Sequence, residues 1–188
     1  TTVNAYNATN DLLTRTDADA DAAVRTVTKY TYDGSGHLTD ITANCTTSGT
    51  TPPATGSTCT GAGTQDASTN LITKYAYTSN NQLEYEFDPL GRVTKHVYDT
   101  YGNETSTYLN CTTSGTTPLT SVTFSTCTAG GTANAETNVR SQATFDQAVT
   151  AGKAGLPTKT TDPLGRDTTS TYDALGRQLT EVLPGDGC

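Results

Sequence analysis

The sequence is poor in apolar residues, in basic residues and in long hydrophobic runs, and each shortage removes a class of protein. Apolar residues make up 32% of the 188 residues, so a large buried core is not expected. Eleven Lys and Arg stand against 19 Asp and Glu, without any basic patch, which argues against a nucleic-acid partner and against attraction to anionic membranes. No run of about 18 apolar residues occurs, so no membrane-spanning helix is predicted.

Catalytic residue sets are missing as well. The two histidines, His37 and His96, fall in a turn phrase and in an expected strand, and neither belongs to a recognisable Ser-His-Asp or Cys-His pattern. No glycine-rich loop of the kind that holds phosphates is present. The sequence therefore predicts a protein that is not an enzyme and that has no cofactor and no metal site.

A short phrase recurs instead: an aromatic residue, Asp, two variable residues, Gly, then a polar residue. The aromatic residue suits a strand end, Asp starts a turn, and Gly supplies the positive φ that closes it, so each copy predicts a β-hairpin. Pro after Asp suits the first central position of such a turn. The motif residues are Tyr32, Asp33 and Gly36; Phe87, Asp88 and Gly91; Tyr98, Asp99 and Gly102; Asp162 and Gly165; and Tyr172, Asp173 and Gly176.

Three looser copies extend the pattern. The segments that begin at Tyr6 and Tyr77 place Asn where Gly would be, and Asn tolerates the left-handed conformation best after Gly. The copy at Phe145 is degenerate, with extra residues before Gly155. The predicted fold class is all-β, with consecutive short antiparallel hairpins stacked into an elongated, twisted or tube-like repeat sheet. Disorder is the alternative for so polar a chain, and it applies to 46–58 and 112–126.

The phrase resembles the YD repeat of Rhs proteins, of the shell components of Tc toxins and of teneurins. The resemblance covers most of the chain in scattered copies. It implies that the hairpins lie side by side in one long sheet that winds into a shell or tube. Asp88-Pro89-Leu90-Gly91-Arg92, and its copy at 162–166, resemble the self-cleavage element at the end of Rhs shells. Arg replaces the family's Leu in both copies, so both are interpreted as ordinary turns without a catalytic role.

A longer period lies above the short one. Asn44-Cys45-Thr46-Thr47-Ser48-Gly49 returns 66 residues later, beginning at Asn110, and Tyr32 returns as Tyr98 at the same offset. Three repeat units follow, each with about three hairpin turns: 1–70, 71–138 and a truncated 139–188. Repeat proteins stack such units so that each contacts mainly its neighbours.

The cysteines occupy matching positions in this period. Cys45 and Cys59 bracket one polar loop and Cys111 and Cys127 bracket the next, which predicts disulfides Cys45–Cys59 and Cys111–Cys127. Closing a loop of about 15 residues contributes roughly 3 kcal/mol in the chain-entropy model. Disulfides indicate an extracellular or cell-surface location. Cys188 is left over, and its predicted partner lies outside this chain segment or in a neighbouring subunit.

Two further motifs occur in the sequence. The alternation Asp17-Ala18-Asp19-Ala20-Asp21 opens like a calcium loop, but Ala22 and Thr28 stand where the EF-hand needs Gly and Glu, so a solvated acidic turn is favoured. Asn44 and Asn110 head Asn-Cys-Thr sequons and are possible glycosylation sites.

The function predicted from these features is structural: a segment of a secreted or cell-surface protein that builds an extracellular β-rich filament by end-to-end stacking. The expected partners are copies of itself or adjacent repeats of the same polypeptide, together with cell-surface glycans. The alternatives are a segment of an Rhs-type shell that encloses a toxin, and an adhesin that binds carbohydrate.

Overall fold

Only one kind of regular element, the β-strand, is present among the residues that the computed structural model describes, which are 2–17, 26–46, 68–111, 136–146 and 155–185. The twelve strands are β1 (Thr2–Tyr6), β2 (Leu12–Asp17), β3 (Thr26–Tyr32), β4 (Leu38–Ala43), β5 (Leu71–Tyr77), β6 (Leu83–Phe87), β7 (Val93–Tyr98), β8 (Glu104–Leu109), β9 (Val139–Phe145), β10 (Pro157–Thr161), β11 (Asp167–Tyr172) and β12 (Gln178–Val182).

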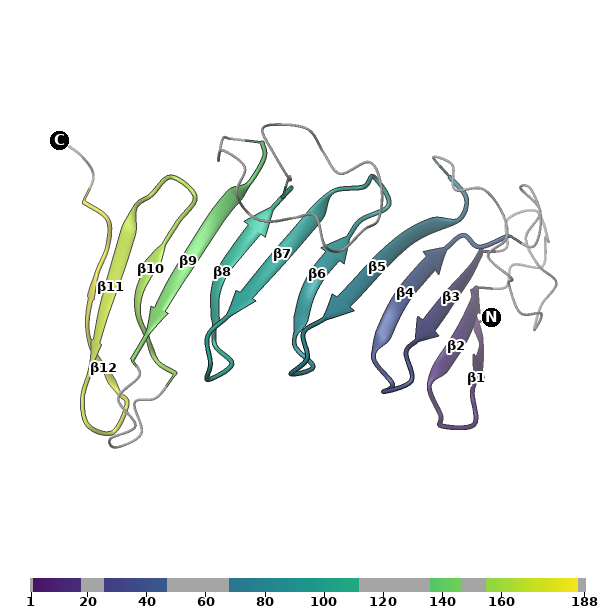
Figure 1. Cartoon of the computed structure of the whole chain (residues 1–188), viewed down its shortest axis with the longest axis horizontal. Coiled ribbons are helices and arrows are strands. Elements are labelled where there is room, and N and C mark those ends of the chain that lie inside the picture. Colours follow the sequence, from purple (N-terminus) through teal and green to yellow (C-terminus); the bar gives the residue numbers. More distant parts are fainter. Residues whose placement is uncertain (1, 18–25, 47–67, 112–135, 147–154, 186–188) are drawn as a thin grey trace. The chain divides into compact units, whose positions relative to one another are not determined.

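The strands form one open antiparallel sheet in strict sequence order, from β1 to β12 (Figure 1). Each strand thus pairs with the strands next to it in the chain, as expected when every link is a hairpin. The predicted fold class, an all-β sheet of consecutive antiparallel hairpins, is confirmed. An elongated or tube-like course of the sheet stays a prediction.

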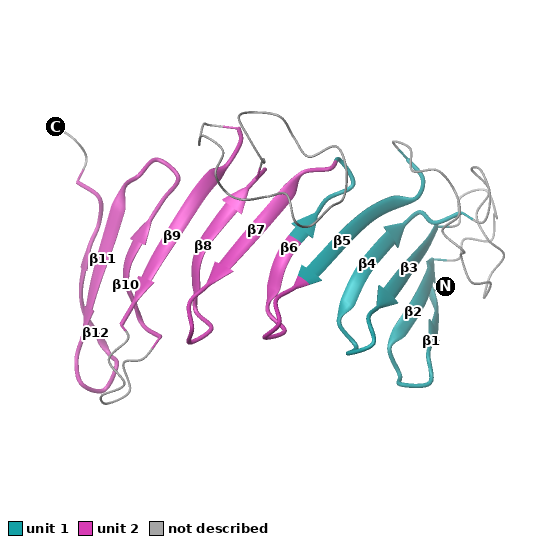
Figure 2. Ribbon diagram, in the orientation of Figure 1, with its two compact units in different colours: residues 1–76, 86–90 teal, residues 77–85, 91–188 magenta. Residues whose placement is uncertain are grey.

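Two units make up the chain: residues 1–76 with 86–90, and residues 77–85 with 91–188 (Figure 2). The first unit contains β1 to β4 and nearly all of β5, and the second contains β7 to β12. The division into three repeats at 1–70, 71–138 and 139–188 stays a prediction, although each of these ranges holds four strands.

Connections alternate between two rims of the sheet, because each strand reverses the direction of the one before it. We call the rim with the β1–β2, β3–β4, β5–β6, β7–β8, β9–β10 and β11–β12 links the turn rim. The other is the loop rim, where 44–70 and 110–138 connect strands and where the two Asp-Pro-Leu-Gly-Arg turns also lie. The 44–70 and 110–138 connections therefore lie on the loop rim, whereas the turns led by Asp33, Asp99 and Asp173 lie on the turn rim.

A β-bulge precedes the tyrosine at the turn rim in four hairpins. The register shifts between Thr31 and Tyr32, between Val97 and Tyr98, and likewise before Tyr6 and Tyr172. In the β7–β8 hairpin the extra residue is Thr105, whose hydroxyl donates to the Val97 carbonyl at 3.1 Å. The bulge thus gives a role to the Thr that ends several copies of the phrase.

Burial is slight, as the composition predicts. The buried apolar residues of the described part are Val27, Cys45, Tyr85, Phe87, Val93 and Cys111. Val27 and Val93 occupy the same place in successive copies, and the carbonyl of each accepts the N–H of a buried cysteine, Cys45 or Cys111, at 2.8 Å. With so little apolar area removed from water, hydrogen bonds between particular side chains and the backbone become decisive.

Val93 provides a test of this thin core. We expect Val93→Ala to lower the free energy of unfolding by about 1–3 kcal/mol, because it removes two buried methyl groups and leaves a cavity. Val182→Ala, at a position 61% exposed, is the matched control and should change stability by less than about 0.5 kcal/mol. Urea denaturation followed by circular dichroism measures both, and equal effects would contradict a core at Val93.

Candidate functional site: locked turns and loop necks

Each aromatic-Asp turn is built around one carboxylate oxygen. In the β7–β8 turn, Asp99 Oδ1 accepts the N–H groups of Tyr101 and Asn103, both at 2.9 Å. The Asp99 N–H donates to the Asn103 carbonyl at 2.9 Å, and the Gly102 N–H donates to the Asp99 carbonyl at 3.1 Å. Gly102 has a φ of 92°, which a β-carbon would disfavour. The arrangement explains why Asp and Gly stand three residues apart.

The same geometry recurs where the sequence predicts it. Turns led by Asp33, Asp162 and Asp173 repeat both side-chain bonds and both backbone bonds. In the β6–β7 turn, Asp88 Oδ1 accepts the Leu90 N–H at 2.9 Å. The glycines at the closing position have φ between 78° and 92°; they are Gly36, Gly91, Gly102, Gly165 and Gly176.

The looser copies form the same turn with other residues. Asn7 Oδ1 accepts the N–H groups of Thr9 and Asp11 at 3.0 and 2.7 Å, so an amide oxygen replaces the carboxylate. Thr78 Oγ1 takes the same two bonds in the β5–β6 turn. Asn10 and Asn81 occupy the left-handed position with φ of 69° and 63°. The prediction that Asn replaces Gly there is confirmed.

The degenerate copy that follows Phe145 also makes both backbone hydrogen bonds that close the turn. The Asp146 N–H donates to the Leu156 carbonyl at 2.9 Å, and the Gly155 N–H donates to the Asp146 carbonyl at 3.2 Å. Gly155 has a φ of 83°. The closing bonds therefore survive although Asp146 and Gly155 are separated by nine positions instead of three.

The polar residue after Gly holds the second carboxylate oxygen, a role that the sequence phrase alone did not suggest. Arg177 Nε donates to Asp173 Oδ2 at 2.6 Å, and Arg166 Nε donates to Asp162 Oδ2 at 2.7 Å. Asn103 and His37 place a nitrogen 3.0 Å from the same oxygen of Asp99 and Asp33. Both oxygens of Asp162 are thus occupied, which supports an ordinary turn rather than self-cleavage at 162–166.

Tyrosine hydroxyls connect successive turns of the turn rim. Tyr98 Oη donates to the Leu83 carbonyl at 2.8 Å, and Tyr172 Oη donates to the Pro157 carbonyl at 2.8 Å. Tyr32 does the same to Leu12 at 3.1 Å. Each acceptor is the first residue of the strand that leaves the preceding turn, so the aromatic residue of the phrase fixes one hairpin against the one before it.

Hydrogen bonding shifts the acidity of these carboxyl groups. The His37 side chain and backbone hold the pKa of Asp33 below its ordinary value, and the Arg166 backbone and guanidinium do the same for Asp162. The pKa of Glu104 is also lowered: burial alone would raise it, but hydrogen bonds from Thr107 and His96 outweigh burial. All three groups therefore stabilise the fold in the ionised form.

A buried network of polar side chains closes the base of each long loop on the loop rim. In the 44–70 connection, the Asn70 N–H donates to the Asn44 carbonyl at 3.0 Å. Asn70 Oδ1 accepts the Thr46 N–H and Asn70 Nδ2 donates to Thr46 Oγ1, both at 2.9 Å. Asn44 Nδ2 donates to the Ser68 carbonyl at 2.6 Å. We call this arrangement a loop neck.

A second neck closes the 110–138 connection. The Asn138 N–H donates to the Asn110 carbonyl at 3.1 Å, and Asn110 Nδ2 donates to the Glu136 carbonyl at 2.8 Å. Asn70 and Asn138 are buried and have positive φ, 53° and 52°. Sequence analysis missed both residues; the signal was the repeated Thr-Asn that precedes an apolar residue, at 69–71 and 137–139.

The predicted disulfide residues fall at these necks. Cys45 and Cys111 are buried, at 0% and 1% exposure. Cys59, Cys127 and Cys188 lie outside the described residues, so the pairings stay predictions. Asn44 and Asn110 use their amide nitrogens at the necks, and a glycan on either nitrogen would replace one of its two N–H groups.

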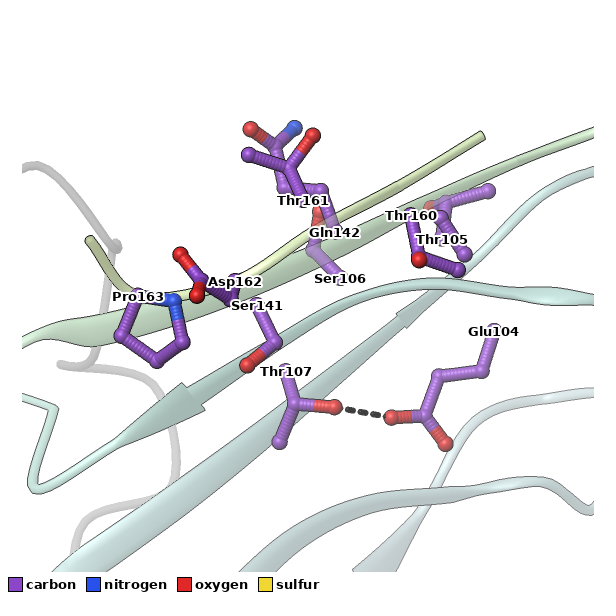
Figure 3. Close-up of a pocket in the computed structure, with 11 residues that line it drawn as sticks. Glu104, Thr105, Ser106, Thr107, Ser141, Gln142, Thr160, Thr161, Asp162 and Pro163 are labelled. Atoms are coloured by element: carbon purple, nitrogen blue, oxygen red, sulfur yellow. Dashed lines mark hydrogen bonds between the residues drawn. The ribbon is translucent and has the colours of Figure 1, made fainter. Parts of the chain in front are cut away.

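One polar cluster outside the turns brings an imidazole, a carboxylate and a hydroxyl group together. Figure 3 shows the groove lined by β8, β9 and β10, in which the Thr107 hydroxyl donates to the Glu104 carboxylate. Glu104 Oε1 also lies 3.1 Å from His96 Nδ1. The carboxylate thus separates imidazole from hydroxyl, so His96 does not activate Thr107 as a base activates a nucleophile.

Groups of metal-ligating residues and membrane-spanning helices are absent from the described ranges. No group of three or more His, Cys, Asp or Glu there is placed to hold a metal ion. Of the acidic alternation at 17–21, the structure describes Asp17 alone, which accepts hydrogen bonds from Thr2 and Arg15. No helix capable of crossing a bilayer occurs in that part of the chain.

Comparison with known proteins identifies the repeat. Residues 153–187 match the family model described as RHS Repeat. The resemblance to the YD/Rhs-repeat family is thereby confirmed for this part of the chain. No curated protein matches the sequence.

Solved structures with a similar course of chain include two crystal structures of TcdB2–TccC3 complexes. The complex with Cdc42 has 16% sequence identity and a TM-score of 0.42, with 100% of this chain covered. The TcdB2–TccC3 structure has 16% identity and a TM-score of 0.41, with 99% covered. This chain spans 9% of the length of each of those chains.

The turn geometry predicts that one oxygen matters more than the charge. We expect Asp99→Ala to destabilise the chain by about 1–2 kcal/mol, because two turn N–H groups lose their acceptor. Asp99→Asn keeps that oxygen, as Asn7 does in the first turn, and should cost less than half as much. Thermal denaturation of both variants measures the difference, and equal losses would show that the oxygen is not the critical group.

The lowered carboxyl pKa values predict acid sensitivity. A depressed folded-state pKa contributes stability above the unfolded value and loses it as pH falls through the folded value. The ordinary values are 3.8 for Asp33 and Asp162 and 4.5 for Glu104. We therefore expect the free energy of unfolding to fall once the pH drops below about 4.5. Urea titrations at fixed pH test this; Asp162→Asn, which does not titrate, should show a shallower loss.

The loop neck predicts a large effect at Asn70. Asn70→Ala should destabilise by roughly 2–4 kcal/mol, because it leaves a buried Thr46 N–H unsatisfied and places Ala at positive φ. Asn70→Gly keeps the φ and loses only the side-chain bonds, so it should fall between wild type and Asn70→Ala. Denaturation under non-oxidising and oxidising conditions measures both; a neutral Asn70→Gly would show that φ alone makes Asn necessary.

Proposed function

We propose that this Rhs-repeat chain is a wall segment of an Rhs-type shell, with a structural and non-catalytic role. The observation that carries the proposal is the combination of an Rhs repeat at 153–187 with a sheet in which every link is a hairpin in sequence order. In the family that the phrase resembles, such hairpins continue side by side into an enclosing wall. Locked turns and tyrosine bonds between successive turns supply rigidity without a thick core.

The cysteines support an oxidising, extracellular setting for this wall. Cys45 and Cys111 are buried at the loop necks, and the disulfides that we propose for both persist outside the reducing cytosol. We propose the pairings Cys45–Cys59 and Cys111–Cys127, with Cys188 joined to a cysteine outside this segment. Peptide mapping without reduction should recover both local pairs, and a Cys45–Cys111 peptide would contradict them.

An extracellular filament is the second candidate. Its support is the neighbour-only order of the strands, which further copies could continue end to end. Contacts with further copies or adjacent repeats belong to both candidates.

Electron microscopy of the protein purified from its natural source distinguishes the two. Hollow particles whose wall has the strand spacing of a sheet, about 4.8 Å, would support the shell. Filaments that dissociate on reduction would favour the second candidate instead. Isolated chains that neither enclose a hollow nor bind further copies would contradict both.

A further inference from the structure

A groove recurs on the turn rim in two successive copies, with equivalent residues in its walls. In the first copy it lies beside β2 and β3 and includes Leu13, Tyr30 and Tyr32. In the second it lies beside β6 and β7 and includes Glu84, His96 and Tyr98, with a volume of about 390 Å³. Tyr32 and Tyr98 make the same bond to a preceding strand, which fixes the correspondence.

The second copy differs by a concentrated change from apolar to polar residues. Leu13 and Tyr30 correspond to Glu84 and His96, each at the same place in its strand. Next to them, Leu38 and Ile41 correspond to Glu104 and Thr107; Tyr30 pairs with Ile41 as His96 pairs with Thr107. The strands of the first copy form with apolar residues at these positions. Folding therefore does not require the polar residues that the second copy has there.

Two of these polar side chains, His96 and Glu84, have atoms without a hydrogen-bond partner among the described residues. His96 Nδ1 lies 3.1 Å from the Glu104 carboxylate, which can only accept, so Nδ1 is the donor in this contact. His96 Nε2 is buried without a hydrogen-bond partner in the structure. The half-buried Glu84 carboxylate likewise has no hydrogen bond or ion pair to any described residue.

The remaining walls suit hydroxyl groups. Tyr98 contributes an aromatic ring, and Asn80, Gln82 and Thr100 contribute amide and hydroxyl groups. Lys95, the one cation among the described lining residues, lies 5.3 Å from the centre of the Tyr85 ring. A carboxylate with planar amides and an aromatic wall accepts from vicinal hydroxyls, whereas an anionic ligand would be repelled by Glu84.

From this combination we propose that the β6–β7 groove binds a neutral saccharide, with the Glu84 carboxylate accepting hydrogen bonds from its hydroxyl groups. The proposal is independent of whether the chain forms a shell or a filament. It goes beyond general adhesion because it places the ligand in one groove and selects neutral sugars over acidic ones.

A glycan array probed with the full chain, followed by calorimetric titration of the best neutral oligosaccharide, tests the proposal. Glu84→Leu installs the residue of the first copy and should weaken binding at least about tenfold, the effect of losing a charge-assisted hydrogen bond. The matched control is Glu181→Leu, at an exposed site on β12, which should bind within about twofold of wild type. If Glu84→Leu lowers the melting temperature, Glu84→Gln keeps the shape and should still weaken binding severalfold.

Three results would overturn the proposal. The first is that no neutral saccharide binds the wild-type chain. The second is that Glu84→Leu and Glu84→Gln both bind as well as wild type. The third is that uronate or sialylated glycans, or a polyamine, bind as tightly as neutral sugars, which would mean that the groove does not select uncharged hydroxyl ligands.

Discussion

The two backbone N–H groups held by one side-chain oxygen are the interaction on which the rest of the structure depends. A chain with so few buried apolar residues cannot define its hairpins by packing alone. The oxygen of Asp99 and its counterparts fixes where each strand ends, and with it the register of the next strand. The tyrosine bond then relates that hairpin to the one before it. Hydrogen bonds within the turns thereby define the hairpins, whereas most domains depend on a hydrophobic core for this.

This dependence explains what the sequence could predict. The turn at Asp173 is complete within five consecutive residues, so its sequence carries all the information needed. The substitution of Asn81 for Gly was likewise readable, because the positive φ is a property of one position. Strand order followed, since a chain of hairpins allows only neighbour pairing.

The loop necks, in contrast, could not be predicted from the local sequence. Asn70 bonds to Thr46 across 24 positions, and nothing near either residue indicates the partner. The two ends of the necks also recur at different spacings. Asn44 and Asn110 are 66 residues apart, whereas Asn70 and Asn138 are 68 residues apart. That difference of two residues hides the correspondence from a search at one fixed period. The polar cluster around His96 follows the 66-residue offset, but the contact between His96 and Glu104 appears only once β7 pairs with β8.

The neighbour-only strand order has a consequence for how the chain acquires its structure. No strand waits for a partner from a distant part of the sequence, so the sequence separation of contacting residues is small within each hairpin. Chains of this kind fold fast for β proteins and can extend from any formed hairpin. Each hairpin can close while the chain is still being made, onto a template already complete behind it. Such a sheet would be built in the order of its synthesis, with little unpaired backbone exposed at any moment.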